Sequence, residues 1–130
     1  MSQILEATPY EMIGGEAGVS QLVNRFYEIM DTDPVAVGVR GVHQADLAEA
    51  REKLRLFLTG WLGGPALYVE RYGHPMLRAR HLPFRIDERM RDEWLYCMFK
   101  AMGEMNLPKA LVDHLEQSFW RTADFMRNAD

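Results

Sequence analysis

The chain has 130 residues, 48% of them hydrophobic and 26% charged, with a formal net charge of −4. This composition is typical of a globular protein with its own core, and the acidic balance argues against broad, non-specific nucleic-acid binding. A single cysteine, Cys97, excludes an intramolecular disulfide and fits a reducing compartment, so we expect a cytoplasmic location. The sequence holds no secretory signal and no membrane-length apolar run, so we expect residues 1–130 to form one domain that does not enter a membrane.

The N-terminal part of the chain predicts two helices separated by a glycine corner. Thr8-Pro9-Tyr10-Glu11 combines a capping threonine, a proline suited to the first helical position and a glutamate that completes a capping box; Gly14-Gly15 then ends this short helix. The next helix ends at Asp31-Thr32-Asp33-Pro34, and its apolar stripe is Val19, Leu22, Val23, Phe26, Tyr27 and Met30. A tyrosine in such a stripe is either a core residue bonded to a backbone carbonyl or a donor that points into a pocket.

The middle of the chain predicts a tight corner, a second long helix and an unusually long connection. Residues 34–45 favour an irregular corner or a short turn of helix, in which His43 by itself indicates only a loop histidine. A helix is predicted from Asp46, with Asp46 as its cap, Glu49 as the capping-box partner and Gly63-Gly64-Pro65 at its end. Its apolar stripe is Leu47, Ala50, Leu54, Phe57, Leu58 and Trp61. The connection that follows, with at most two helical turns at 66–72, exceeds about twenty residues, and loops of that length are usually functional.

The C-terminal half predicts two further long helices. Asp87 caps the first, and its apolar stripe is Met90, Trp94, Met98, Ala101, Met102 and Met105. Asn106-Leu107-Pro108 separates it from the last helix, and the stripe of that helix is Leu111, Leu115, Ser118, Phe119, Thr122 and Met126. No segment alternates with a period of two, so the predicted fold class is all-α.

The long central connection carries the strongest candidate for binding chemistry, His81. A neutral imidazole binds a metal ion through the lone pair of one ring nitrogen. The neighbouring Arg78 and Arg80 can hold anionic groups of a planar cofactor, while Leu82 and Phe84 can exclude water. A haem requires these groups on one side. The alternative is a surface histidine between two solvated arginines.

Several separated motifs resemble the truncated haemoglobins, and within them the group II branch. They are Gly14-Gly15, Gly63-Gly64-Pro65, the run GHPMLRARHLPFRI and the helix opening RDEWLYCM. These motifs agree with the family in order and extend over nearly the whole chain. The resemblance implies a shortened globin, in which two antiparallel helix pairs form a two-over-two sandwich around haem b.

The resemblance also implies roles for individual residues. His81 is then the proximal iron ligand, and the distal site holds Tyr27, His43 and Trp94, with Ala50 in the place of the ordinary distal histidine. The implied pocket lining consists of Leu54, Phe57, Leu58, Phe84 and Met98, and the implied propionate partners are Lys53, Tyr68, Arg78 and Arg80. Hydrogen bonds from the distal residues would slow the release of a bound ligand.

The function implied is reversible binding of dioxygen and other small diatomic ligands by a monomer or homodimer. The alternative on the same haem is a peroxidase or nitric oxide dioxygenase, which requires a separate reductase because nothing in the chain resembles a flavin or nicotinamide domain. A third and unrelated possibility is a cofactor-free helical interaction module, which predicts a colourless protein. Neither a nucleic-acid partner nor a membrane is expected.

Overall fold

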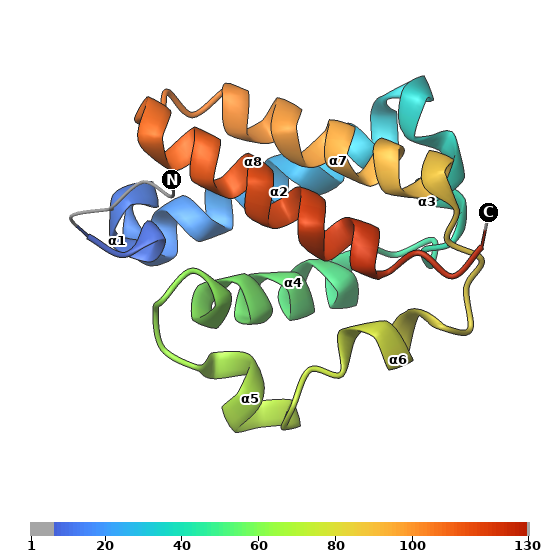
Figure 1. The fold of residues 1–130 in the computed structure, drawn as a ribbon, viewed down its shortest axis with the longest axis horizontal. Helices are drawn as coiled ribbons and strands as arrows, with labels where there is room; N and C mark the ends of the chain where they lie inside the picture. Colours follow the sequence, from blue (N-terminus) through green and yellow to red (C-terminus); the bar gives the residue numbers. More distant parts are fainter. Residues whose placement is uncertain (1–6, 130) are drawn as a thin grey trace.

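The computed structural model describes residues 7–129 (Figure 1). Its elements are α1 (Pro9–Ile13), α2 (Gly15–Thr32), the 3-10 turn η1 (Pro34–Ala36), α3 (Val37–Gly41), α4 (Ala48–Trp61), α5 (Leu67–Tyr72), α6 (Leu77–His81), α7 (Glu88–Gly103) and α8 (Lys109–Phe125). Helices and turns alone make up the described residues, so the all-α prediction is confirmed.

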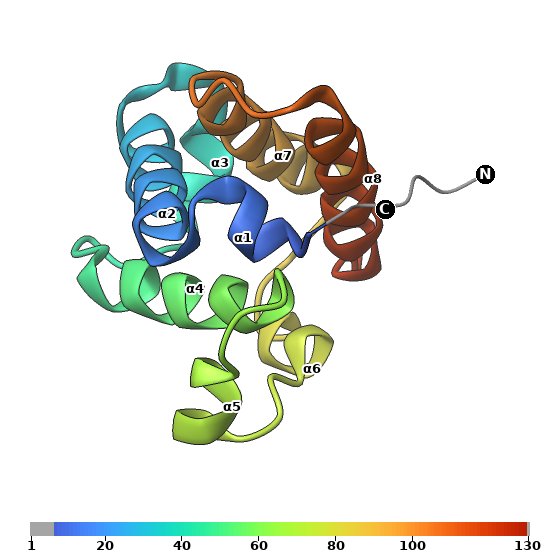
Figure 2. The same cartoon turned by 90° about the vertical axis from the view of Figure 1, so that its left-hand side faces the viewer.

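Four long helices make two packed pairs. α2 packs against α4, α7 packs against α8, and α2 also contacts α7 and so joins the pairs. The short helices α5 and α6 lie on the side of α4 that faces away from α7 (Figures 1 and 2). In the described part of the chain, no helix combines the length and the apolar character that crossing a bilayer requires.

The core is concentrated around α2. All six members of the apolar stripe predicted for this helix are buried, from Val19 to Met30, and they meet Met98 and Met102 of α7 in one cluster. The inward-facing residues of α4 differ, because Leu54, Phe57 and Trp61 are only half-buried. They pack against the edge of the core and also line a cavity.

The glycine corners let α1 pack against the end of α4. The capping box predicted at Thr8 and Glu11 is confirmed, and the backbone N–H of Tyr10 donates to the carbonyl of Leu62 at 2.8 Å. Gly63 has a φ of +103°, which a residue with a side chain rarely adopts. A Cβ on Gly64 would lie 2.8 Å from the Tyr10 ring. Both glycines are therefore required by the close approach of α1.

Two predictions of local structure were wrong. α4 begins at Ala48 with Leu47 as its cap residue, and Asp46 only accepts a hydrogen bond from the Ala48 N–H at 2.9 Å. Glu49 pairs with Lys53 at 2.8 Å, so the predicted capping box does not form. His81 belongs to a helix, α6, rather than to a loop. The sequence did not predict this helix, because five residues are too few for an apolar period to be detected.

The corner between α2 and α4 is attached to α7 through Asp33. Its carboxylate accepts hydrogen bonds from Tyr96 Oη at 2.7 Å, Val35 N–H at 3.0 Å and Lys100 Nζ at 3.1 Å. These three partners, Tyr96 first, lower the pKa of Asp33 to about 2. The corner is thereby held against the helix that also contributes Trp94.

Gly18 provides the first test of the fold, because a Cβ at this position would overlap the backbone carbonyl of Ile13. We predict that Gly18→Ala lowers the free energy of unfolding by at least about 2 kcal/mol. Gly103→Ala is the matched control, because a Cβ at that position meets no atom within 4 Å. It should leave stability unchanged or raise it by up to about 1 kcal/mol. Urea unfolding followed by circular dichroism measures both, and equal stabilities would contradict the packing of α1 on α2.

Candidate functional site

A largely apolar cavity of about 270 Å³ lies between α4, α6, α7, α8 and the corner after α3. Eight of the residues singled out in the sequence line it: Tyr27, His43, Leu54, Phe57, Leu58, His81, Phe84 and Trp94. They come from five different parts of the chain, so the fold assembles them. Aromatic and aliphatic side chains dominate the lining, as is usual for sites that bind an organic cofactor.

His81 stands at the end of α6, where a hydrogen bond fixes its proton. Its Nδ1 lies 2.6 Å from the carbonyl oxygen of Leu77, one helical turn earlier. A carbonyl oxygen has no proton to donate, so Nδ1 carries the hydrogen and Nε2 of the neutral ring keeps a free lone pair. The imidazole therefore has the tautomer that a metal ligand requires.

His43 reaches the cavity from the corner after α3 and is held in the same way. Its Nδ1 lies 2.8 Å from the carbonyl oxygen of Val39, so Nδ1 is again the protonated nitrogen. Burial lowers the pKa of His43 below its ordinary value, and the charge of Arg40 lowers it further, whereas the bond to Val39 acts in the opposite direction. At neutral pH the ring is uncharged, and its Nε2 accepts hydrogen bonds rather than donating them.

Tyr27 and Trp94 bring two hydrogen-bond donors to the cavity lining. The hydroxyl of Tyr27 donates to the Ala50 carbonyl at 3.4 Å, which is longer than the usual ~2.5–3.0 Å for such a bond. Burial raises the pKa of Tyr27, so its hydroxyl keeps its proton. The indole N–H of Trp94 makes no hydrogen bond with any residue that the structure describes. The Trp94 N–H is therefore open to a small ligand, and the Tyr27 hydroxyl is held by only one long hydrogen bond.

Aromatic packing holds these donors in place. Phe26, which is fully buried on α2, contacts both of them edge-on, with ring centroids 4.8 Å from Tyr27 and 5.2 Å from Trp94. The Tyr27 ring also meets the His43 ring edge-on at 5.9 Å. The three polar groups at this end of the cavity thus share one rigid apolar support.

The structure does not bring the remaining predicted residues into the cavity lining. Lys53 pairs with Glu49 and lies 5.6 Å from the Tyr72 ring. Arg80 donates to the Pro75 carbonyl at 2.7 Å. Tyr68 lies behind Phe57, with ring centroids 6.1 Å apart. The others are Met98, which is fully buried in the core cluster, Ala50, which packs against that cluster, Leu82, which is exposed, and Arg78, described below.

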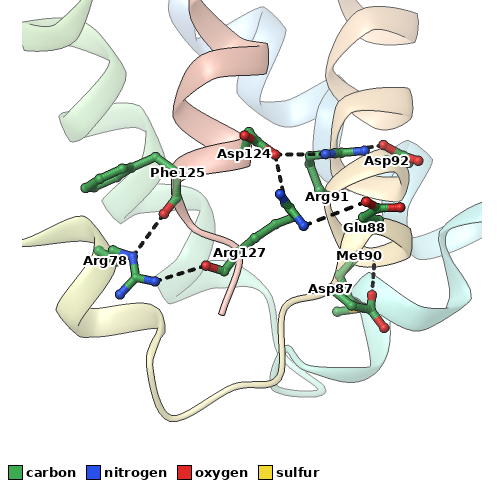
Figure 3. A network of polar contacts seen from close by, with 9 residues as sticks. All are labelled: Arg78, Asp87, Glu88, Met90, Arg91, Asp92, Asp124, Phe125 and Arg127. Atoms are coloured by element: carbon green, nitrogen blue, oxygen red, sulfur yellow. Dashed lines mark hydrogen bonds and ion pairs between the residues drawn. The ribbon is translucent and has the colours of Figure 1, made fainter. Parts of the chain in front are cut away.

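Several lining residues were not singled out as site residues. Arg91 is the main one: it lines the cavity, but its charge is neutralised by Asp124 at 2.8 Å and Asp92 at 3.0 Å (Figure 3). The others are Val39, Val42, Trp61, Leu77, Ile86, Met90, Phe119, Thr122, Ala123 and Met126. Half of these ten residues belong to the predicted apolar stripes, so helical periodicity could have identified them as facing inward. They are Trp61, Met90, Phe119, Thr122 and Met126.

The C-terminal segment holds the His81 side of the cavity closed. Asn128 Oδ1 accepts the Ile86 N–H at 2.8 Å, and its Nδ2 donates to the carbonyls of Phe84 at 2.8 Å and His81 at 3.3 Å. Arg78 reaches from α6 to the backbone carbonyls of Phe125 and Arg127, both at 3.2 Å (Figure 3). Residues 125–128 are thus hydrogen-bonded to four positions of the 78–86 stretch: Arg78, His81, Phe84 and Ile86.

Comparison with known proteins identifies the family. Residues 8–128 match the sequence model of the bacterial-like globins. The chain is 45% identical over 120 residues to a group 2 truncated hemoglobin of Bacillus subtilis, which covers 92% of this chain and 88% of that protein. The chain belongs to the bacterial-like globin family, and its resemblance to the group II truncated haemoglobins is confirmed.

Solved haemoglobin structures agree with this assignment over nearly all of the chain. A group II 2-on-2 hemoglobin from Agrobacterium tumefaciens has a TM-score of 0.93 at 45% identity and covers 100% of both chains. A truncated oxygen-avid haemoglobin from Bacillus subtilis has a TM-score of 0.85 at 44% identity and covers 94% of this chain and 100% of that one. The two-over-two helical arrangement is therefore the family fold.

Asn128 offers a test of the closed cavity wall. Asn128→Ala removes three side-chain hydrogen bonds to the 81–86 stretch. We predict a loss of about 1–3 kcal/mol in the free energy of unfolding and faster hydrogen exchange at the Ile86 amide. Asn24→Ala, which removes one 3.3 Å bond from Arg51, is the control and should cost little. An unchanged Ile86 exchange rate in Asn128→Ala would show that the segment does not hold the wall.

Proposed function

We propose that this truncated haemoglobin binds haem b through His81 and reversibly holds dioxygen and other small diatomic ligands beside Tyr27 and Trp94. The observation that carries the proposal is a set of three fixed groups in one apolar cavity: an imidazole with a free Nε2, the Trp94 N–H, and the Tyr27 hydroxyl, which is held by a single long bond to Ala50. When bound, the haem iron supplies the coordination position at which a diatomic ligand attaches. The protein supplies the axial nitrogen, the dry surroundings and the hydrogen bonds.

The lining suits a flat, mostly apolar cofactor. Phe57, Phe84, Phe119 and Trp61 offer aromatic surface, and the neutralised Arg91 adds no unpaired charge. The Leu77 carbonyl orients His81 as metal-bound histidines are usually oriented, through the ring nitrogen that does not bind the metal. Lys53 and Tyr68, together on the α4–α5 side next to Phe57, remain our prediction for propionate partners, with Arg78 and Arg80 as further candidates.

The two donors favour slow ligand release. A neutral hydrogen bond contributes about 0.5–1.5 kcal/mol net, and ~1.4 kcal/mol corresponds to a factor of ten. Tyr27 and Trp94 acting together would therefore slow release by roughly one to two orders of magnitude. One relative of known structure is described as oxygen-avid, which agrees with this expectation.

An enzyme using the same haem is the second candidate, and His43 is the observation that favours it. A neutral imidazole whose Nε2 accepts protons can serve as a general base toward hydrogen peroxide. Peroxidase or nitric oxide dioxygenase turnover requires a separate reductase. Sustained consumption of peroxide or nitric oxide in the presence of a reductant would favour the enzyme over a ligand carrier.

His81 is tested by its removal. We predict that His81→Ala loses haem at least about tenfold faster than the wild type, because even outer-shell partners of metal ligands are worth ~10–100-fold in affinity. The transfer of haem to excess apomyoglobin, followed at the Soret band, measures this rate. His114→Ala, which replaces a histidine outside the cavity lining, should retain haem as the wild type does. Equal retention by both variants would refute the assignment of His81.

The donors are tested by their conservative replacements. Tyr27→Phe and Trp94→Phe should each speed oxygen release about two- to tenfold, because each loses one hydrogen bond. The control variants are Tyr96→Phe, whose hydroxyl serves Asp33, and Trp120→Phe, whose side chain is exposed. Stopped-flow displacement of oxygen by carbon monoxide gives the rates. If the cavity variants release oxygen no faster than the controls, Tyr27 and Trp94 are packing residues only.

A further inference from the structure

Glu93 is the one buried charged side chain among residues 7–129, with an exposed fraction of 5%. Both of its carboxylate oxygens have partners on different elements. Oε1 accepts the backbone N–H of Val39 at 2.9 Å, and Oε2 accepts Arg89 Nε at 2.9 Å. Burying a carboxylate is costly unless it is paired and hydrogen-bonded. Glu93 meets both conditions, and the question is which element its carboxylate holds in place.

The Val39 amide lies in the first turn of α3, and that turn has no cap of its own. Ala36 stands at the cap position of α3 without a side-chain hydrogen bond. The first N–H groups of a helix have no partner within the helix. Glu93, from α7, supplies one for Val39 across 54 positions of sequence. The carboxylate therefore fixes α3 against α7.

The same Val39 residue holds His43 through its carbonyl oxygen. His43 Nδ1 donates to that oxygen at 2.8 Å, and the His43 backbone N–H donates to the backbone carbonyl oxygen of Arg40 at 3.1 Å. Glu93 and His43 are thus linked by two hydrogen bonds through one residue of α3. Trp94 follows Glu93 directly on α7, so one turn of α7 sets both a cavity donor and the orientation of the imidazole.

Gly38 leaves the space that the carboxylate occupies. A Cβ at this position would lie 2.9 Å from Oε1 and 3.0 Å from Oε2 of Glu93. The Gly38 backbone is helical, with no positive φ, so its conformation alone does not require glycine. Glycine is required at this position because the Glu93 carboxylate approaches so closely.

We propose that Glu93 is a positioning residue for the distal side of the cavity. Through Val39 it holds His43 in the tautomer whose Nδ1 is protonated, and so keeps the Nε2 lone pair available in the cavity. The inference deepens the proposed function and rests on it for the use of the cavity. The tautomer of His43 is nevertheless a property of the protein that can be measured whether or not haem is present.

The test compares two glycine replacements on the same short helix. Gly38→Ala displaces the carboxylate, whereas Gly41→Ala adds a Cβ that meets no atom within 4 Å. Nitrogen-15 NMR of the histidine side chains, on purified protein reduced under carbon monoxide, reports the His43 tautomer. We expect Gly38→Ala to lower the ratio of the Nδ1–H to the Nε2–H form by about threefold or more, the factor expected from one weakened hydrogen bond. Gly41→Ala should keep the wild-type ratio.

Replacements of Glu93 itself give the second arm. Glu93→Leu removes the acceptor and should shift the tautomer as Gly38→Ala does, while Glu93→Gln keeps an oxygen for the Val39 N–H and should restore the wild-type ratio. Arg89→Gln, which leaves the bond to Val39 intact, should also keep it. If Glu93→Leu does not fold, Gly38→Ala still decides the question.

Two results would overturn the inference: a wild-type His43 tautomer in folded Gly38→Ala, or an equal shift in Gly41→Ala. The Soret band of the same samples reports haem separately. The absence of a protein-bound Soret band after hemin has been added would refute the proposed function, and the tautomer ratios would still decide the role of Glu93.

Discussion

The hydrogen bond from His81 Nδ1 to the Leu77 carbonyl, 2.6 Å long, decides which ring nitrogen is free in the cavity. Without it, an imidazole at the end of a five-residue helix would exchange tautomers and rotate. The remaining structure protects this arrangement. Asn128 and Arg78 attach the His81 side of the cavity to the C-terminal segment, and the inward faces of α4 and α8 line it.

The distal side is built differently, because its three polar groups share one apolar support instead of being fixed by the chain end. Tyr27 and Trp94 pack against Phe26 and carry hydrogen-bond donors, while His43, fixed by Val39, has a lone pair on Nε2 that can accept a hydrogen bond. Under the proposed function, the two donors would stabilise a ligand with partial negative charge, and His43 would act as an acceptor toward a ligand that carries a proton. Oxygen binding would then use the donors, and peroxide chemistry would use His43 as a base when a reductant is present.

Much of the fold could be predicted because it depends on local patterns. The stripe of α2, the capping box at Thr8 and the cap at Asp87 follow from residues a few positions apart, and all three are found in the structure. The start of α4 was misplaced because a cap depends on the backbone angles of one residue. α6 was missed because one turn leaves no period.

The site was less predictable because its details depend on long-range partners. The positions of Tyr27, His43, His81 and Trp94 around one cavity agree with the motif resemblance, although their roles stay predictions. Arg91 was missed because Asp124, 33 positions away, neutralises it beside the cavity. Glu93 was missed because its partners, Val39 and Gly38, meet it only in the folded chain.

The most direct test of the account is a titration of the purified, haem-free protein with hemin, followed by visible absorption, reduction and exposure to carbon monoxide. The account predicts a protein-bound Soret band that saturates at one haem per chain and shifts reversibly with carbon monoxide. A spectrum that stays that of free hemin at every ratio would contradict it, and the cavity would then be an apolar pocket with another ligand.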